Sequence, residues 1–209
     1  MASGRKHSDN NEQKLQGKYD VIITGGGIVG STLACAIGKN SLFSNLKILL
    51  LEGSSDKKFQ LKSEYSNRVV ALNQSTKSLL KSLEIWHHVE KMRLQPVRHM
   101  QVWDACSDAL ISFSSREILD DDVAYIVEND VLLEAVNIEL KSSSVKNVDI
   151  LYGAKVTGYE LSKSGSQGNI VKMNNGDSYS CDLLCIRGEG FFAQLYTVML
   201  AGLKKSQVH

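Results

Sequence analysis

The hydrophobic pattern near the start of the chain predicts a strand, a helix and a second strand. Residues 19–24 form a short β-branched run that ends in glycines, which is typical of a buried strand. Residues 28–37 predict a helix with small side chains along it, and residues 46–51 form a second apolar run that ends at Glu52. This order is a βαβ unit, so we expect parallel strands in an α/β, Rossmann-like domain.

A polar loop, a helix and a hairpin are predicted next. Residues 53–67 are polar and predict a loop. Residues 74–89 predict one helix, because leucines and a tryptophan recur there at helical spacing. Residues 100–103 and 109–113 predict the two strands of a hairpin.

In the second half of the chain, the sequence pattern predicts a helix and then a series of short strands. Residues 126–128 lead into a helix expected from about Asp130 to Leu140. Short strands are then predicted over residues 148–152, 155–161, 169–173 and 178–186. Residues 174–177 contain an Asn-Gly pair, the strongest short signal for a hairpin turn. We therefore expect an antiparallel β-meander after the βαβ unit.

The composition is that of an ordinary globular chain. Of its 209 residues, 43% are hydrophobic and 22% charged, and the formal net charge is +1. That balance gives no basic face, so no nucleic-acid partner is expected. The four cysteines are too few for a disulfide framework in a chain of this length. Cys181 and Cys185 lack further ligands nearby, so no metal site is expected.

The two ends of the chain differ in character from the middle. Residues 1–18 are polar, without the apolar segment of a secretory signal, and we expect them to be disordered. No apolar run is long enough to span a bilayer. Residues 191–203, followed by Lys204 and Lys205, leave two alternatives. They form either an interfacial amphipathic helix, giving peripheral membrane association, or a poorly ordered tail.

Residues 25–30 carry the pattern Gly-x-Gly-x-x-Gly between the first strand and the first helix. In that context Gly25 permits the tight turn, Gly27 lets the backbone approach a pyrophosphate, and Gly30 lets the helix pack close to the sheet. The free N–H groups at the helix N-terminus then face the anion. The alternative is a glycine-rich turn without a ligand.

Glu52 lies 22 residues after Gly30, at the end of the second predicted strand. A carboxylate at this place accepts hydrogen bonds from ribose hydroxyls and repels a 2′-phosphate. We therefore expect the adenosine half of FAD or NAD, and not of NADP, to bind here. The alternative is a solvated acid at a strand end.

Several segments together carry a resemblance to a known family. Residues 19–52, 66–69, 100–107 and 125–130 resemble the ubiquinone-biosynthesis flavin monooxygenases, most closely the eukaryotic mitochondrial members that hydroxylate the C5 position of the ring. That family is similar to p-hydroxybenzoate hydroxylase in fold. The match runs from about residue 19 to about residue 184.

The resemblance implies bound FAD, with the three glycines and Glu52 on its ADP half. Arg68 matches the family's flavin-contacting arginine; the alternative is a surface arginine. Asn129 falls where relatives place a Gln or Asn that contacts the cofactor; the alternative is an N-cap of the following helix. Val156 matches a strand position whose backbone lies near adenine in relatives; the alternative is a core residue.

The resemblance also implies a reaction and its setting. In the family, the reaction is hydroxylation of the aromatic ring of a polyprenylated phenol, with electrons from ferredoxin and ferredoxin reductase. Its members join a multi-enzyme ubiquinone-biosynthesis assembly on the matrix side of the mitochondrial inner membrane. No catalytic side chain is assigned, because the flavin carries the reactive oxygen.

The family pattern stops after Leu184. We therefore expect an FAD-binding domain over residues 19–186, with a hairpin insert near 98–128, and a divergent tail over 187–209. The C-terminal half of the monooxygenase fold is expected to be missing, as in a truncated form. Two alternatives stay open: a non-catalytic fragment that binds nucleotide or partner proteins, and an NAD-dependent dehydrogenase.

Overall fold

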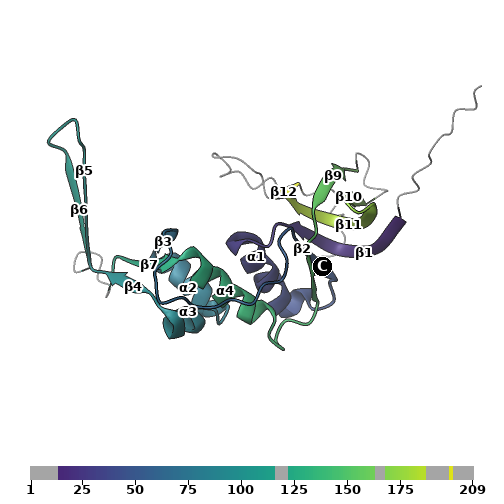
Figure 1. Cartoon of the computed structure of the whole chain (residues 1–209), viewed down its shortest axis with the longest axis horizontal. Helices are drawn as coiled ribbons and strands as arrows, with labels where there is room; N and C mark the ends of the chain where they lie inside the picture. Colours follow the sequence, from purple (N-terminus) through teal and green to yellow (C-terminus); the bar gives the residue numbers. More distant parts are fainter. Residues whose placement is uncertain (1–13, 116–121, 163–167, 187–197, 200–209) are drawn as a thin grey trace, which may run out of the picture.

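A computed structural model describes residues 14–115, 122–162, 168–186 and 198–199 (Figure 1). The largest sheet has seven strands, and six of them run in the order β8-β2-β1-β11-β10-β9, with β12 paired to β11. Their bounds are β1 Lys14–Thr24, β2 Ile48–Glu52, β8 Val148–Tyr152, β9 Val156–Glu160, β10 Asn169–Met173, β11 Asp177–Ile186 and β12 Val198–Met199. The sheet is mixed, so the α/β fold class is confirmed.

The predicted βαβ unit is present as β1, α1 (Ile28–Lys39) and β2. Strands β1 and β2 are parallel, with Val21 opposite Ile48. Strand β1 begins at Lys14 and not at residue 19, because its first half pairs with the start of β11. The expected disorder over residues 1–18 is therefore wrong for residues 14–18, and residues 1–13 lie outside the described part.

Strand β8 corrects the expected meander. Its bounds were predicted correctly, but it pairs in parallel with β2 and extends the βαβ sheet. The antiparallel part consists of β9, β10 and β11, to which the short strand β12 adds an antiparallel pairing with β11. Gly176, in the predicted Asn-Gly turn between β10 and β11, has a φ of 88°, a conformation that glycine tolerates best. Of the expected tail over 187–209, only the short strand β12 is described.

A helical layer and a small second sheet lie beside the main sheet. The helices are α2 Gln74–Ser82, α3 Trp86–Met92 and α4 Asn129–Leu140, and α4 packs along α1. The second sheet has the order β3-β7-β4, formed by β3 Val69–Leu72, β7 Ala124–Glu128 and β4 Gln95–Val97. One face of the main sheet and these helices share a single core cluster.

The single helix predicted over residues 74–89 is wrong, because the structure divides it into α2 and α3. Leu83 and Ile85 are both buried, yet positions two apart lie on opposite sides of a continuous helix. Glu84 between them has a φ of 61°, in the left-handed region. This turn lets both side chains reach the core, so packing overrides the helical pattern.

The predicted hairpin is confirmed as β5 (His99–Trp103) and β6 (Leu110–Ser114), and it projects from the body of the molecule (Figure 1). Directly opposite residues share a face of such a ladder. The pairs Met100–Phe113 and Val102–Ile111 therefore make one apolar face. Val102 and Ile111 are 52% and 58% exposed, so the described residues leave this face largely uncovered.

Within the described ranges, no helix is long and apolar enough to cross a membrane.

Candidate functional site

The loop between β1 and α1 turns sharply at its first glycine. Gly25 has a φ of 100°, which a side chain would disfavour, and its N–H donates to the carbonyl of Leu51 in β2 (2.8 Å). Gly27 is extended and caps the N-terminus of α1, where its carbonyl accepts the N–H of Ser31 (2.9 Å). The turn is thus held between two parallel strands and directed at a helix N-terminus, the arrangement that binds anions.

Gly30 makes the closest approach in the turn. A β-carbon at this position would lie 1.9 Å from the carbonyl oxygen of Gly25. Ser31, which is 1% exposed, donates its hydroxyl to the carbonyl of Gly26 (2.9 Å), and this hydrogen bond holds the turn against the first turn of α1. Ser31 was not predicted as part of the turn; its sequence signal is a hydroxyl on the buried face of a helix, which needs a hydrogen-bond partner.

Glu52 reaches the glycine turn, as its spacing from Gly30 predicted. Its Oε2 accepts the N–H of Gly26 (2.7 Å), and its Oε1 accepts the N–H of Ser54 (2.7 Å). A β-carbon on Gly26 would meet Glu52 Oε2 at 2.8 Å, so only glycine fits beside this carboxylate. Each carboxylate oxygen retains a lone pair that can accept a further hydroxyl group.

Arg68 and Asn129, 61 positions apart in the sequence, are brought together by the second sheet. Val69 pairs with Glu128, and the N–H of Asn129 donates to the carbonyl of Arg68 (2.9 Å). The Arg68 side chain is exposed, and no partner for it is recorded among the described residues. The backbones of Arg68 and Asn129 therefore adjoin at the start of α4.

Asn129 is the first residue of α4 and not its N-cap, a position that Glu128 occupies. The N-cap alternative is therefore wrong. The Oδ1 atom of Asn129 is buried, and the structure gives it no hydrogen-bond partner within the described ranges. A buried polar atom without a partner is costly, and such atoms often mark a place where a ligand binds.

Val156 lies in β9 opposite Met173 and packs, half-buried, against the core on the far face of the main sheet. Two residues before it, the N–H of Ala154 donates to the backbone carbonyl of Glu52 (2.9 Å). The chain thus passes the end of β2 just before Val156. The contacts of its side chain are those of a core residue.

A buried ion pair lies immediately before Asn129. Glu128 is 4% exposed, and Arg93 binds it through Nε–Oε2 (2.5 Å) and Nη2–Oε1 (3.0 Å). Arg93 also donates to the backbone carbonyls of Lys62 (2.9 Å) and Glu64 (3.2 Å). The N–H of Ser66 donates to Glu128 Oε1 (2.5 Å). The hydrogen bonds from Arg93, with that from Ser66, hold the pKa of Glu128 below its usual value.

The same contacts border a pocket of about 330 Å³. The Arg93 guanidinium lies over the ring of Tyr65, 4.5 Å from its centroid, as a cation–π contact. The pocket is lined by Phe59, Leu61, Lys62, Glu64, Tyr65, Ser66, Asn67, Arg93 and Asp130. Nothing in the sequence pointed to the pair of Arg93 and Glu128, because these two residues lie 35 positions apart and no motif spacing links them.

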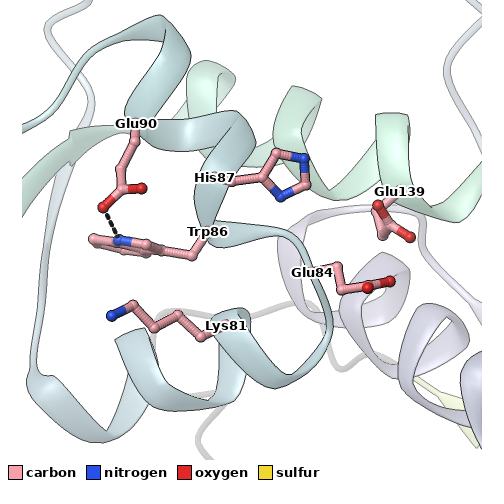
Figure 2. Close-up of a pocket in the computed structure, with 6 residues that line it drawn as sticks. All are labelled: Lys81, Glu84, Trp86, His87, Glu90 and Glu139. Carbon is pink, nitrogen blue, oxygen red and sulfur yellow. Dashed lines mark hydrogen bonds between the residues drawn. The ribbon is translucent and has the colours of Figure 1, made fainter.

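A second pocket, of about 430 Å³, lies among the helices (Figure 2). It is lined by Lys81, Glu84, Trp86, His87, Glu90 and Glu139. Two of its polar groups bind each other, since Trp86 Nε1 donates to Glu90 (2.7 Å; Figure 2). Glu139 binds residues outside the lining: it accepts from Lys39 (2.6 Å) and lies 3.3 Å from His88. Lys39 ends α1, whereas the glycine turn begins it, so this pocket lies away from the turn.

The described residues offer no metal centre and no activated thiol. No group of three or more His, Cys, Asp or Glu side chains among them could hold a metal ion. Burial raises the pKa of Cys35 to about 11 and that of Cys181 to about 12, and it also raises the pKa of Cys185. With their pKa values raised, these three thiols stay protonated near neutral pH.

No family model matches the sequence. Curated relatives do match it. The chain is 43% identical over 168 residues to the ubiquinone biosynthesis monooxygenase COQ6, mitochondrial, of Drosophila melanogaster, covering 79% of this chain and 35% of that protein. Homo sapiens COQ6 is 45% identical over 142 residues, covering 68% and 30%. The chain therefore spans about a third of the length of these relatives.

Solved structures share the fold at low sequence identity. The p-nitrophenol 4-monooxygenase PnpA of Pseudomonas putida matches with a TM-score of 0.62 and 16% identity, over 82% of this chain and 41% of that one. The flavin-dependent monooxygenase PieE, solved with FAD and substrate, matches with a TM-score of 0.59 and 15% identity, over 81% and 30%. These likenesses confirm the predicted fold, and the curated relatives confirm the family resemblance. Over its matched residues, the chain is similar in sequence to the mitochondrial ubiquinone biosynthesis monooxygenases COQ6.

Proposed function

We propose that the described domain binds FAD and is the cofactor-binding part of a monooxygenase of ubiquinone biosynthesis. The observation that carries the proposal is the junction of the glycine turn with Glu52, where the carboxylate binds the N–H of Gly26 and the turn, too tight for side chains at Gly26 and Gly30, leads into the N-terminus of α1. The relatives are named for this activity, and PieE was solved with FAD.

The residues present fit the ADP half of FAD. The N–H groups at the start of α1 would bind the diphosphate, and Glu52 would accept hydroxyl groups of the ribose. The same carboxylate would repel a 2′-phosphate, which favours FAD or NAD over NADP. FAD agrees with the relatives, and a second pair of groups, Arg68 and Asn129, gives the rest of that cofactor a cation and an unpaired acceptor.

When bound, the flavin supplies the redox chemistry of oxygen transfer to an aromatic ring. The chain's own residues bind and orient it: the turn fixes the diphosphate, Glu52 fixes the sugar, and Asn129 Oδ1 accepts a hydrogen bond from the remaining part. Arg68 adds a positive charge opposite an anionic group. In this proposal these side chains transfer no proton; they bind and orient the cofactor.

The finer parts of the proposal follow from the relatives. We infer a polyprenylated phenol as substrate, hydroxylated at the C5 position, with electrons from ferredoxin and its reductase. We also infer a mitochondrial location on the matrix side of the inner membrane, within the ubiquinone-biosynthesis assembly. The names of the relatives support ubiquinone biosynthesis, monooxygenase activity and mitochondria.

A titration of the purified 209-residue chain tests the cofactor. FAD, ADP, NAD and NADP are added separately, and binding is followed by equilibrium dialysis and, for FAD, by the visible flavin absorption of the protein peak in gel filtration. We expect FAD to bind best, ADP to compete with it, and NADP to bind worst. NAD binding without FAD binding would select a dehydrogenase, and no binding of any of the four would overturn the proposal.

A further inference from the structure

Arg93 and Glu128 form an anchor pair for the polar loop that precedes β3. The fork of the guanidinium binds both oxygens of one carboxylate, a geometry that lysine cannot reproduce. Glu128 is 4% exposed, and the Arg93 side chain is 21% exposed. A pair desolvated to this degree needs further hydrogen bonds to satisfy its remaining groups.

The loop backbone supplies those hydrogen bonds. Arg93 donates to the carbonyls of Lys62 and Glu64, and Glu128 accepts the N–H of Ser66. These three bonds to the main chain act within five consecutive residues of a segment that has no helix or strand of its own. The anchor pair therefore fixes the path of the loop, and it does so whatever side chains the loop carries.

The anchored loop and its anchor Glu128 both adjoin the residues proposed to hold the cofactor. Ser66 is two residues before Arg68, and Glu128 is directly before Asn129. The pairing of Val69 in β3 with Glu128 in β7 holds Arg68 next to Asn129. A shift of the loop would move Arg68 relative to Asn129, because the backbones of these two residues are held together here by a hydrogen bond, from the Asn129 N–H to the Arg68 carbonyl (2.9 Å).

We propose that Arg93 and Glu128 are positioning residues, which set Arg68 and Asn129 for the part of FAD beyond its ADP half. The inference rests on the proposed function. The anchor pair itself touches no cofactor in this assignment; it acts through the loop and through the start of α4. Its loss should therefore reduce the preference for FAD over ADP, because ADP uses the glycine turn and Glu52 only.

The test compares the unsubstituted chain with Arg93→Lys and Glu128→Gln. Arg93→Lys keeps the charge and loses the fork, and Glu128→Gln keeps the shape and loses the charge. We expect each to weaken FAD binding about tenfold and to leave ADP binding within about twofold. Circular dichroism checks that both variants are folded. The matched control is Asp56→Asn, which breaks an exposed ion pair between the same loop and Lys141, and it should change neither affinity.

Trypsin gives a second readout that needs no cofactor. The loop contains Lys57, Lys58 and Lys62, all exposed, and cleavage there requires the loop to leave its anchored path. We expect faster cleavage in Arg93→Lys and Glu128→Gln, and an unchanged rate in Asp56→Asn.

The outcomes separate the inference from the function on which it rests. If the unsubstituted chain binds FAD but the variants bind FAD and ADP as before, or lose both equally, the positioning role is wrong and the proposed function stands. If the unsubstituted chain fails to bind FAD, the proposed function is wrong and the role falls with it. In that case, faster trypsin cleavage of Arg93→Lys and Glu128→Gln would show only that the pair holds the loop in place, with no role in cofactor binding.

Discussion

A β-carbon on Gly30 would lie 1.9 Å from the carbonyl oxygen of Gly25, far closer than two unbonded atoms approach. The third glycine of the turn is therefore in contact with the first, and the turn can close only while residue 30 has no side chain. This contact is a property of the backbone, so it holds with or without a ligand.

Gly30→Ala should therefore destabilise the fold and weaken nucleotide binding together. Overpacking of this kind costs about 1–3 kcal/mol, to be measured as a shift in the urea midpoint. The matched control is Gly158→Ala in β9, where an added β-carbon meets nothing within 4 Å. Equal stability of the two variants would contradict the contact between Gly25 and Gly30.

Glu52→Gln should weaken the binding of both FAD and ADP about tenfold, because a hydrogen bond to a charged acceptor is worth roughly 1.5–3 kcal/mol. The amide can still accept one of the two N–H groups, from Gly26 or Ser54, that the carboxylate accepts. Removing the negative charge should also reduce the discrimination against NADP. Dissociation constants from dialysis test both effects.

The control for this substitution is Glu160→Gln, at the exposed end of β9, where the carboxylate pairs with Lys172. It changes charge by the same amount on the same sheet and should leave all nucleotide affinities alone. If the Glu52→Gln variant binds FAD as tightly as the unsubstituted chain, the Glu52 carboxylate does not contribute to the binding site.

Glu128 should make stability depend on pH in the acid range. Hydrogen bonds from Arg93 lower its pKa in the folded state, so the folded protein takes up this proton less readily than the unfolded chain does. The stabilisation is complete above the unfolded pKa of about 4.3 and is lost as the pH falls through the folded value. Urea midpoints measured from neutral pH downward should show this loss.

In Glu128→Gln the titrating group is gone, so that variant should lose less stability on acidification than the unsubstituted chain. At neutral pH it should be the less stable of the two, because the half-buried Arg93 guanidinium then lacks its counter-charge. Parallel curves for the two proteins would exclude Glu128 as a source of the acid dependence.

The apolar face of the β5–β6 hairpin should make the chain prone to aggregation. Val102→Thr together with Ile111→Thr removes exposed apolar surface from one rung and keeps β-branched side chains. We expect less light scattering on concentration, with the thermal midpoint changed by no more than about 2 °C, since a surface change of this kind costs roughly 0.5 kcal/mol or less.

The control lies on the neighbouring rung of the same hairpin. Gln101 and Ser112 face the opposite side, and replacing both by Thr should leave aggregation as it was. If both double variants scatter light equally, the apolar face is not the cause.

Much of the fold followed from local pattern. The βαβ unit, the hairpin and the bounds of β8 were predicted because short apolar runs end at glycines or polar turns. The division of residues 74–89 into two helices was not, because it depends on the left-handed Glu84, whose cause is the simultaneous burial of Leu83 and Ile85 in the tertiary core. The parallel pairing of β8 with β2 likewise depends on which strands become neighbours.

The candidate site divides in the same way. Gly25, Gly30 and Glu52 were found from spacing, since one local motif positions all three. The family resemblance brought in Arg68 and Asn129, and the structure shows how a single rung of β3 and β7 places them together. Arg93 gave no signal, because its partner is set by three-dimensional packing and neither residue belongs to a recognisable spacing.

The place of β1 between β2 and β11 has a consequence for how the polypeptide folds. Strand β1 cannot complete its hydrogen bonds until β11 has left the ribosome, as Thr24 and Cys185 lie 161 positions apart. Closing so large a loop is slow, and the waiting strand edge is open to wrong pairing. The unpaired edge of β1, the strand that leads directly into the glycine turn, should therefore be the part of the chain that most needs a chaperone during synthesis.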